Sequence, residues 1–209
     1  MKEITLTSCE IEDRSVAKLV EVIKHLTSLE TLNLAENRIG YDGVVALTGG
    51  LRSWTLLKML DLSWNGMGDR SAAKLAKGIK HLTSLETLNL AGNRIGDDGV
   101  VALTGALENL TSLKTIDLSW SGMGDRSATK LAEGIKHLPS LETLNLAGNG
   151  IEFDGVVALI GGVKNLTSLK TLDLDHNKIE GRDVAKLVEG IKHLTSLEIH
   201  GLSTNRTGL

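Results

Sequence analysis

The chain has 209 residues and a formal net charge of −3, from 23 Lys and Arg against 26 Asp and Glu. A charge so near zero indicates neither nucleic acid nor an acidic membrane surface as a partner. The single cysteine, Cys9, excludes a disulfide framework and a multi-cysteine metal site. The N-terminal segment is polar and no apolar run is long enough to span a bilayer, so we expect a cytoplasmic protein that does not contact membranes.

A 28-residue repeat runs through the whole chain. Rows such as SLETLNLAEN and SLKTLDLDHN end 28 residues apart, and the column of their last residues reads Asn37, Asn65, Asn93, Ser121, Asn149, Asn177 and Asn205, with Cys9 one row earlier. A fixed period of this size is typical of stacked repeats. Because no linker or change in composition interrupts the rows, we predict one domain over residues 1–209, with about seven full repeats and a truncated C-terminal strand.

Each row predicts a strand followed by a helix. In the first row, apolar residues alternate at Ile4 and Leu6, which is the period of a strand with one buried face. From Val16 to Ile23 the apolar spacing becomes i, i+3, i+4, i+7, which is the period of a helix. The same order recurs in the following rows, and the helices share one leucine column: Leu19, Leu47, Leu75, Leu103, Leu131, Leu159 and Leu187.

The rows also predict how the helices begin and how the chain ends. Aspartates stand just before four helices, where they are expected to cap free backbone N–H groups: Asp13, Asp69, Asp97 and Asp125. The last row stops after its strand and has His200 where a core leucine is expected. The C-terminal core is therefore predicted to be poorly covered, which indicates a fragment of a longer receptor or end-to-end self-association.

A single strand-and-helix unit cannot bury both of its apolar faces, so the rows must stack. Neighbouring strands then pair in parallel, about 4.8 Å apart, and the wider helices make the stack curve with the strands inside. We therefore predict an α/β fold, a right-handed horseshoe solenoid with a parallel concave sheet and helices on the convex side. Aromatic residues are only 2% of the chain, which fits a core of repeated aliphatic layers.

The frame L-x-x-L-x-L-x-x-N with a helical 28-residue unit resembles the leucine-rich repeats of the ribonuclease-inhibitor-like class, over essentially the whole chain. The phrase LNLAGNRIGDDGVVAL is similar to repeats of cytosolic nucleotide-binding innate-immune receptors and of the proteins that activate the small GTPase Ran. The resemblance implies a non-catalytic module that binds a protein ligand, with innate-immune recognition as its role and regulation of a small GTPase as the alternative. The near-identity of the rows also fits a consensus or engineered scaffold without a natural ligand.

No residue pattern indicates catalysis or a bound ion. The Asn column is predicted to be a structural ladder whose amides satisfy backbone groups of the turns, with Cys9 as a buried member and Ser121 as a second substitute. The histidines at the helix ends recur 56 residues apart, too far to share one metal ion: His25, His81, His137 and His193. The chain has no Gly-rich phosphate loop, and equivalent side chains point in parallel rather than converge. We therefore predict no enzyme activity, no cofactor and no metal.

The concave face is predicted to be acidic. Strand alternation places three columns of side chains on it, and the aspartates in these columns are Asp61, Asp117, Asp173 and Asp175. None of the three columns contains Lys or Arg. Two interpretations stay open: a polar sheet face without a ligand, or a surface complementary to a basic protein.

Four of the five aromatic residues are predicted to lie on one lateral edge. Trp64 and Trp120 directly precede the Asn column, and Tyr41 and Phe153 replace the capping aspartate, whereas Trp54 falls in a core leucine column. Exposed Trp and Tyr are enriched at binding sites, so we predict that these four contact the partner. The alternative is that each Trp lies flat on the backbone of the next row. Basic residues of the same edge are expected to stack on the rings: Arg38, Arg94, Lys178 and Arg206.

Overall fold

Strand and helix alternate along the chain in the computed structural model, which describes residues 1–202 and residue 205. The strands are β1 (Glu3–Thr5), β2 (Thr31–Asn33), β3 (Met59–Asp61), β4 (Thr87–Asn89), β5 (Thr115–Asp117), β6 (Thr143–Asn145), β7 (Thr171–Asp173) and β8 (Glu198–His200). The helices are α1 (Asp13–Ile23), α2 (Tyr41–Leu51), α3 (Gly68–Ile79), α4 (Gly96–Leu107), α5 (Asp125–Ile135), α6 (Phe153–Val163) and α7 (Gly181–Ile191).

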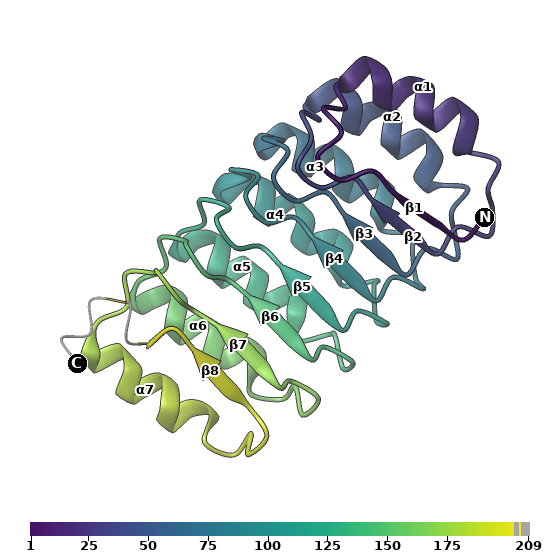
Figure 1. Ribbon diagram of the computed structural model, residues 1–209. Helices are drawn as coiled ribbons and strands as arrows, with labels where there is room; N and C mark the ends of the chain where they lie inside the picture. Colours follow the sequence, from purple (N-terminus) through teal and green to yellow (C-terminus); the bar gives the residue numbers. More distant parts are fainter. Residues whose placement is uncertain (203–204, 206–209) are drawn as a thin grey trace.

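The strands form one parallel sheet, in the order β1 to β8. Equivalent residues pair across neighbouring rows, so Leu32 lies opposite Ile4 on one side and Leu60 on the other. Figure 1 shows the helices packed on one face of the sheet, the other face open, and the two chain ends at opposite ends of the stack. The predicted α/β horseshoe with its parallel sheet is confirmed. Among the described residues, no helix is long and apolar enough to cross a membrane.

The core lies between the sheet and the helices. It uses the same positions in every row, such as Leu32 on the strand and Leu47 on the helix, which are almost completely buried. Trp54 is also completely buried, as its leucine column predicted, and its indole N–H donates to the carbonyl of Ile23 at 3.1 Å. Gly50 leaves room for this ring, because a Cβ there would lie 2.5 Å from it.

The Asn column joins neighbouring turns. The Asn37 amide donates to the carbonyl of Leu6 in the preceding row at 2.7 Å and to that of Leu34 in its own row at 3.0 Å. Its oxygen accepts from the N–H groups of Cys9 at 3.0 Å and Ile11 at 2.9 Å. Such an amide satisfies buried backbone groups of two rows at once. Donation to the preceding row recurs at Asn65, Asn93, Asn149, Asn177 and Asn205.

The two substitutes in this column differ in exposure. Ser121 is completely buried, and its backbone N–H donates to the Asn149 side chain at 3.1 Å. Cys9 is exposed, so the prediction that it is buried is wrong. The first row has no preceding row to cover it, so solvent reaches the thiol, which donates to the carbonyl of Thr7 at 3.3 Å.

Three of the predicted capping aspartates bond to the next row rather than to their own helix. Asp13 is the first residue of α1, and it accepts from the N–H of Gly40, just before α2, at 2.6 Å. Asp97 accepts from the residue before α5 at 2.9 Å, and Asp125 from the residue before α6 at 2.7 Å. The prediction that they cap their own helices is therefore wrong. Stacking places each carboxylate beside the free N–H groups of the neighbouring helix.

The last strand pairs one residue out of the 28-residue period. Ile199 lies opposite Leu172, and His200 lies opposite Asp173 with its side chain exposed. The prediction that His200 occupies a core position is therefore wrong. A shift of one residue exchanges the two faces of a strand and here keeps the apolar Ile199 on the core side. Gly201 follows with a φ of 79°, at a point where a Cβ would overlap the backbone of the neighbouring row.

Candidate functional site

Two tryptophans lie at the edge of the concave face where the strands end. Trp64 and Trp120 have left-handed backbones, with φ values of 57° and 54°. This conformation is uncommon outside glycine and a genuine outlier for a bulky residue. The exposed fractions of the two side chains are 55% and 49%. The turns that leave β3 and β5 therefore hold an indole at the surface.

Each indole lies against the backbone of the next row. A Cβ on Gly92 would lie 2.5 Å from the Trp64 ring, and one on Gly148 would overlap the Trp120 ring. The glycines thus form a seat for the rings, as the alternative interpretation of the sequence expected. About half of each side chain nevertheless stays open to solvent, so the same arrangement leaves a surface for a ligand.

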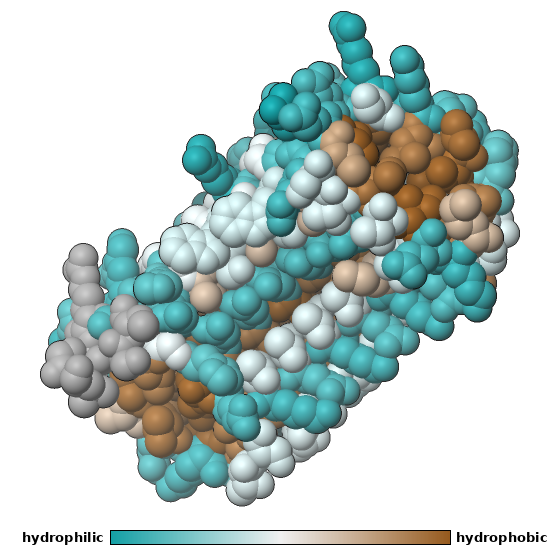
Figure 2. Space-filling model, in the orientation of Figure 1, coloured by the Kyte–Doolittle hydropathy of each residue, from teal (hydrophilic) through white to brown (hydrophobic). Residues whose placement is uncertain are grey.

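His176 continues this row two repeats further along. Its ring centroid lies 5.8 Å from that of Trp120, with 44° between the planes, and its φ of 51° is also left-handed. We call Trp64, Trp120 and His176 the aromatic ridge. Figure 2 shows bulky pale side chains along one border of the polar concave face. Sequence analysis did not single out His176, although it shares the tryptophan column of the repeat.

Tyr41 and Phe153 stand apart from the ridge, because they are the first residues of α2 and α6. Each ring carries a cation of the following helix. The Arg70 guanidinium lies 4.8 Å from the Tyr41 ring centroid, and the Lys186 ammonium lies 4.7 Å from that of Phe153. The prediction that all four aromatics form one edge surface is therefore wrong, and two of them belong to cation–π pairs on the helix side.

The basic residues predicted to stack on these rings make other contacts. Arg38 pairs with two glutamates of the first row at 3.9 Å each, and Lys178 pairs with Glu152 at 3.3 Å. That prediction is wrong for these two residues, because carboxylates lie closer to them than the rings do. Arg206 lies outside the described residues.

Several aspartates of the concave floor are engaged by their neighbours. Asp61 is only 8% exposed, and it accepts from the N–H and hydroxyl of Ser63 at 2.9 and 2.7 Å and from the Asn89 amide at 3.1 Å. The prediction that Asp61 offers a free carboxylate to a partner is therefore wrong. Asp117 is half-buried and accepts the Asn145 amide at 3.0 Å, so it keeps more of its charge accessible.

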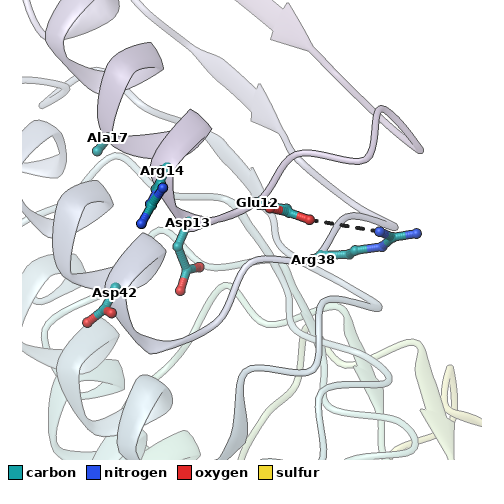
Figure 3. A pocket seen from close by; sticks show the side chains of 6 residues that line it. All are labelled: Glu12, Asp13, Arg14, Ala17, Arg38 and Asp42. Carbon is teal, nitrogen blue, oxygen red and sulfur yellow. Dashed lines mark ion pairs between the residues drawn. The ribbon is translucent and has the colours of Figure 1, made fainter.

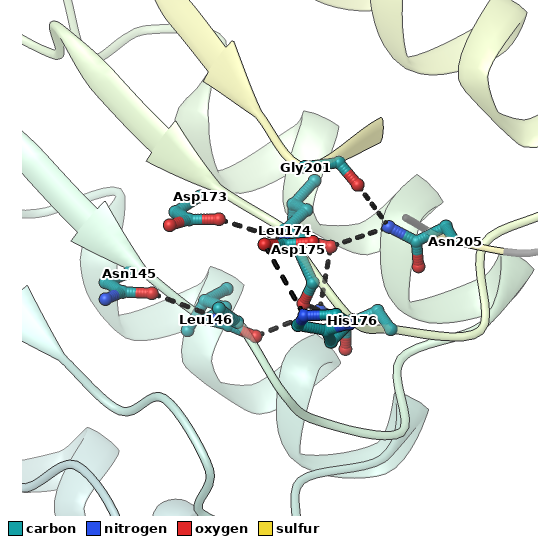
Figure 4. A network of polar contacts seen from close by, with 10 residues as sticks. Asn145, Leu146, Asp173, Leu174, Asp175, His176, Gly201 and Asn205 are labelled. Atoms are coloured by element: carbon teal, nitrogen blue, oxygen red, sulfur yellow. Dashed lines mark hydrogen bonds and ion pairs between the residues drawn. The ribbon is translucent and has the colours of Figure 1, made fainter. Parts of the chain in front are cut away.

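The more open carboxylates gather at the C-terminal end of the floor. Asp175 lies beside His176, with Oδ2 3.8 Å from Nε2, and the Asp173 carboxylate accepts from the Asp175 N–H at 2.9 Å. Figure 4 shows these side chains together with Asn205 around the end of β7. His200 stands opposite Asp173 on β8. Among the residues that the structure describes, no three His, Cys, Asp or Glu side chains are placed to hold a metal ion.

An ion-pair ladder follows the opposite edge, where the strands begin. Glu30 lies between Lys2 and Lys58, at 2.5 and 2.6 Å. Hydrogen bonds from these two lysines lower the pKa of Glu30 from 4.5 to about 2. Sequence analysis missed this ladder, although Glu and Lys alternate there at 28-residue intervals. Further pairs join Glu86 to Lys114 and Glu142 to Lys170.

An open pocket of about 590 Å³ lies near the start of α1 (Figure 3). Glu12 and Arg38 on its rim form one of the ion pairs, at 3.9 Å. Asp13 already accepts a hydrogen bond from the next row. Because the charges are of both signs and serve the fold, the pocket does not aim a set of like groups at one ligand. Its lining residues are Glu12, Asp13, Arg14, Ala17, Arg38 and Asp42.

Leucine-rich repeats match six segments, which together cover more than half of the chain: residues 25–47, 55–76, 81–103, 109–132, 137–159 and 165–188. Among curated proteins, none matches the chain significantly. The crystal structure of an internalin C2 from Listeria monocytogenes is similar, with a TM-score of 0.65 over 94% of this chain and 69% of that one, at 22% sequence identity. Identity at this level shows a shared fold. The chain belongs to the leucine-rich repeat family.

Proposed function

We propose that the chain is a non-catalytic module of the ribonuclease-inhibitor-like subclass that binds a basic protein through its concave face and its aromatic ridge. The aromatic ridge is the observation that carries the proposal, because it holds two half-exposed indoles on a rigid sheet edge. Tryptophans that are fixed before binding lose little entropy in a complex and are enriched among binding hot spots. A helix in each of the first seven repeats supports the subclass.

The charge of the concave face supports a basic ligand. Its three columns contain no Lys or Arg. Asp117, Asp173 and Asp175 are only partly buried and lie beside the ridge. A face of one sign steers a ligand of the opposite sign and rejects one of the same sign.

Affinity capture with a double variant tests this function. Trp64→Ala/Trp120→Ala should reduce recovery of a specific bound protein about tenfold or more, since each truncation removes a hot-spot side chain. Leu56→Ala is the matched control, because Leu56 is about as exposed, at 51%, but precedes β3 on the opposite edge. Equal recovery of every protein by the wild type and the double variant would contradict the proposal.

Cytosolic immune recognition is the role that we propose for such a module. Its support is the similarity of residues 88–103, LNLAGNRIGDDGVVAL, to the repeats of immune receptors. A nucleotide-binding or effector domain encoded beside these repeats would support the role. A complete gene without such a domain would argue against it.

End-to-end self-association is a second proposal, which rests on the two ends of the stack. Figure 2 shows a hydrophobic area at each end. Val22 of α1 is 76% exposed and Val188 of α7 is 47% exposed, and Ile4 and Ile199 of the outer strands are only partly buried. Light scattering over a concentration series should show growing mass for the wild type and less growth for Val188→Lys. A strict monomer at high concentration would refute the proposal.

A further inference from the structure

The aromatic ridge advances two repeats at a time. Trp64, Trp120 and His176 follow β3, β5 and β7, and the glycine seats Gly92 and Gly148 lie in the rows between them. The strands from β3 to β7 pair in parallel without a change of register. Because neighbouring strands are about 4.8 Å apart, successive rings are separated by about 9.6 Å along the stack.

A ligand that lies along the ridge must repeat at the same distance. A polyproline II helix has three residues per turn and a rise of about 3.1 Å, so an equivalent side chain returns every 9.3 Å or about that distance. An α-helix returns after about 5.4 Å, and residues on one face of a strand after about 6.7 Å. Polyproline II is therefore the regular conformation that places one equivalent residue on each ring in single turns.

The rings and the floor specify which residues the ligand carries. Aromatic surfaces are the usual docking sites for prolines of such helices, which are already extended and lose little entropy on binding. Beside the ridge, Asp117 and Asp175 are partly exposed, and Glu36 occupies the ridge column one row before Trp64. With no Lys or Arg in the concave columns, the residues between the prolines meet carboxylates.

We propose that the aromatic ridge and the acidic floor bind a polyproline II segment with proline at every third position and Arg or Lys between the prolines. The segment lies along the stack, across the strands, and contacts Trp64, Trp120 and His176 in successive turns. This inference rests on the proposed function, since it narrows the basic protein ligand to one conformation and one residue pattern.

Fluorescence anisotropy with labelled twelve-residue peptides tests the inference on the full chain. The probe is four copies of Pro-Pro-Arg. Four copies of Gly-Ser-Arg have the same charge without the polyproline conformation, and four copies of Pro-Pro-Glu have the conformation with the opposite charge. We expect the Pro-Pro-Arg peptide to bind about tenfold or more tighter than either control, because it alone has both the periodicity and the charge.

Variants then locate the site. Trp64→Ala/Trp120→Ala should weaken binding of Pro-Pro-Arg about tenfold or more, and Leu56→Ala should leave it unchanged. Circular dichroism melting verifies that each variant is folded. Equal affinity for Pro-Pro-Arg and Gly-Ser-Arg would overturn the inference, and so would binding that is indifferent to the two tryptophans.

The outcomes separate this inference from the proposed function. If the ridge variant loses a captured protein but the wild type does not bind Pro-Pro-Arg, the polyproline segment is overturned and the interaction module stands. If the ridge variant loses neither peptide nor protein, both proposals fall. Loss of both, with the Leu56→Ala control intact, supports both.

Discussion

A glycine determines where each exposed tryptophan of the ridge lies. The left-handed turn brings the indole of Trp120 over the next row, and the missing Cβ of Gly148 lets the ring approach the backbone. The tryptophan and its glycine are therefore one structural unit, although they are 28 residues apart in the chain. Without the glycine, the ring has to rise from the sheet edge.

Gly148→Ala should destabilise the protein and move the Trp120 ring. Its φ of 66° costs an L-residue about 1 kcal/mol or more, and the added Cβ overlaps the indole. We expect the free energy of unfolding to fall by about 2 kcal/mol and the fluorescence of the exposed tryptophans to change. Denaturant unfolding and emission spectra measure both effects.

Gly66→Ala is the matched control for this prediction. Gly66 has a φ of 78°, but no heavy atom lies within 4 Å of the Cβ position, so only the backbone cost applies. The difference between the two substitutions measures the contact with the ring. Equal losses of stability would show that the ring does not depend on its seat.

Phe153 and Asp183 show how a lost contact between rows is replaced. In other rows an aspartate accepts from the N–H before the next helix, as Asp125 does for Glu152. Phe153 stands at the equivalent position and cannot accept. The helix α7 instead forms its own capping box, in which the Glu180 N–H donates to the buried Asp183 at 2.8 Å.

Asp183→Ala should lower the free energy of unfolding by about 1–2 kcal/mol, because the Glu180 N–H loses its acceptor. Adding Phe153→Asp should restore part of this loss, since its carboxylate takes the position that Asp125 has in the preceding row. Thermal melting of the two single variants and the double variant gives the coupling between them. A double variant that is only as stable as the sum of the single effects would contradict the replacement.

Among the elements, the ion-pair ladder before the strands gives stability a dependence on pH. The pKa of Glu30 is lowered to about 2 by hydrogen bonds from Lys2 and Lys58. A lowered pKa in the folded state contributes stability that is fully present above the unfolded value of 4.5 and is lost as the pH falls from there towards 2. Glu30→Gln should therefore weaken the pH dependence of unfolding between these values.

Glu142→Gln provides the comparison. Glu142 has its pKa lowered chiefly by a hydrogen bond from one lysine, Lys170, so its removal should change the acid slope less than removal of Glu30. Denaturant midpoints measured between pH 2 and 5 test this order. Because the groups are exposed, high salt should reduce both effects. Identical acid slopes for the wild type and Glu30→Gln would contradict the role of the ladder.

The order of the elements follows from sequence because each row repeats the same local signals. Alternating Ile4 and Leu6 and the helical stripe from Val16 predicted β1 and α1. The position of β8 did not follow from the period, since it is set by pairing with β7, where Ile199 and not His200 faces the core. Strand register depends on burial by a neighbouring row, which a count along the chain does not contain.

Across the whole molecule, the sequence predicted the sheet and its horseshoe but only part of the candidate site. It identified Trp64 and Trp120, because they interrupt a column of small residues. It placed Tyr41 and Phe153 with them, although these rings pair with cations on the helix side. Such contacts depend on which side chain of the next row comes within reach, and the repeat alone does not specify it.

A stack of repeats in which each row contacts only its neighbours should open from its ends. Helix α7 buries only Asp183, Leu187 and Ile191, whereas α3, in the interior, buries twice as many residues. In such a linear array the stability of a row is the sum of its own term and its interfaces, and an end row has one interface. Amide hydrogen exchange should therefore be fastest in β1, α1, α7 and β8 and slowest from β3 to β6.

Core truncations in the same helix column test this gradient by stability. Leu103→Ala in the interior should cost about 2–5 kcal/mol, because Leu103 is almost completely buried between two neighbouring helices. Leu19→Ala in α1 should cost clearly less, because Leu19 is only partly buried and belongs to an end row that opens first. Equal costs, or uniform exchange along the chain, would mean that the rows unfold as one cooperative body and that the exposed ends do not limit its stability.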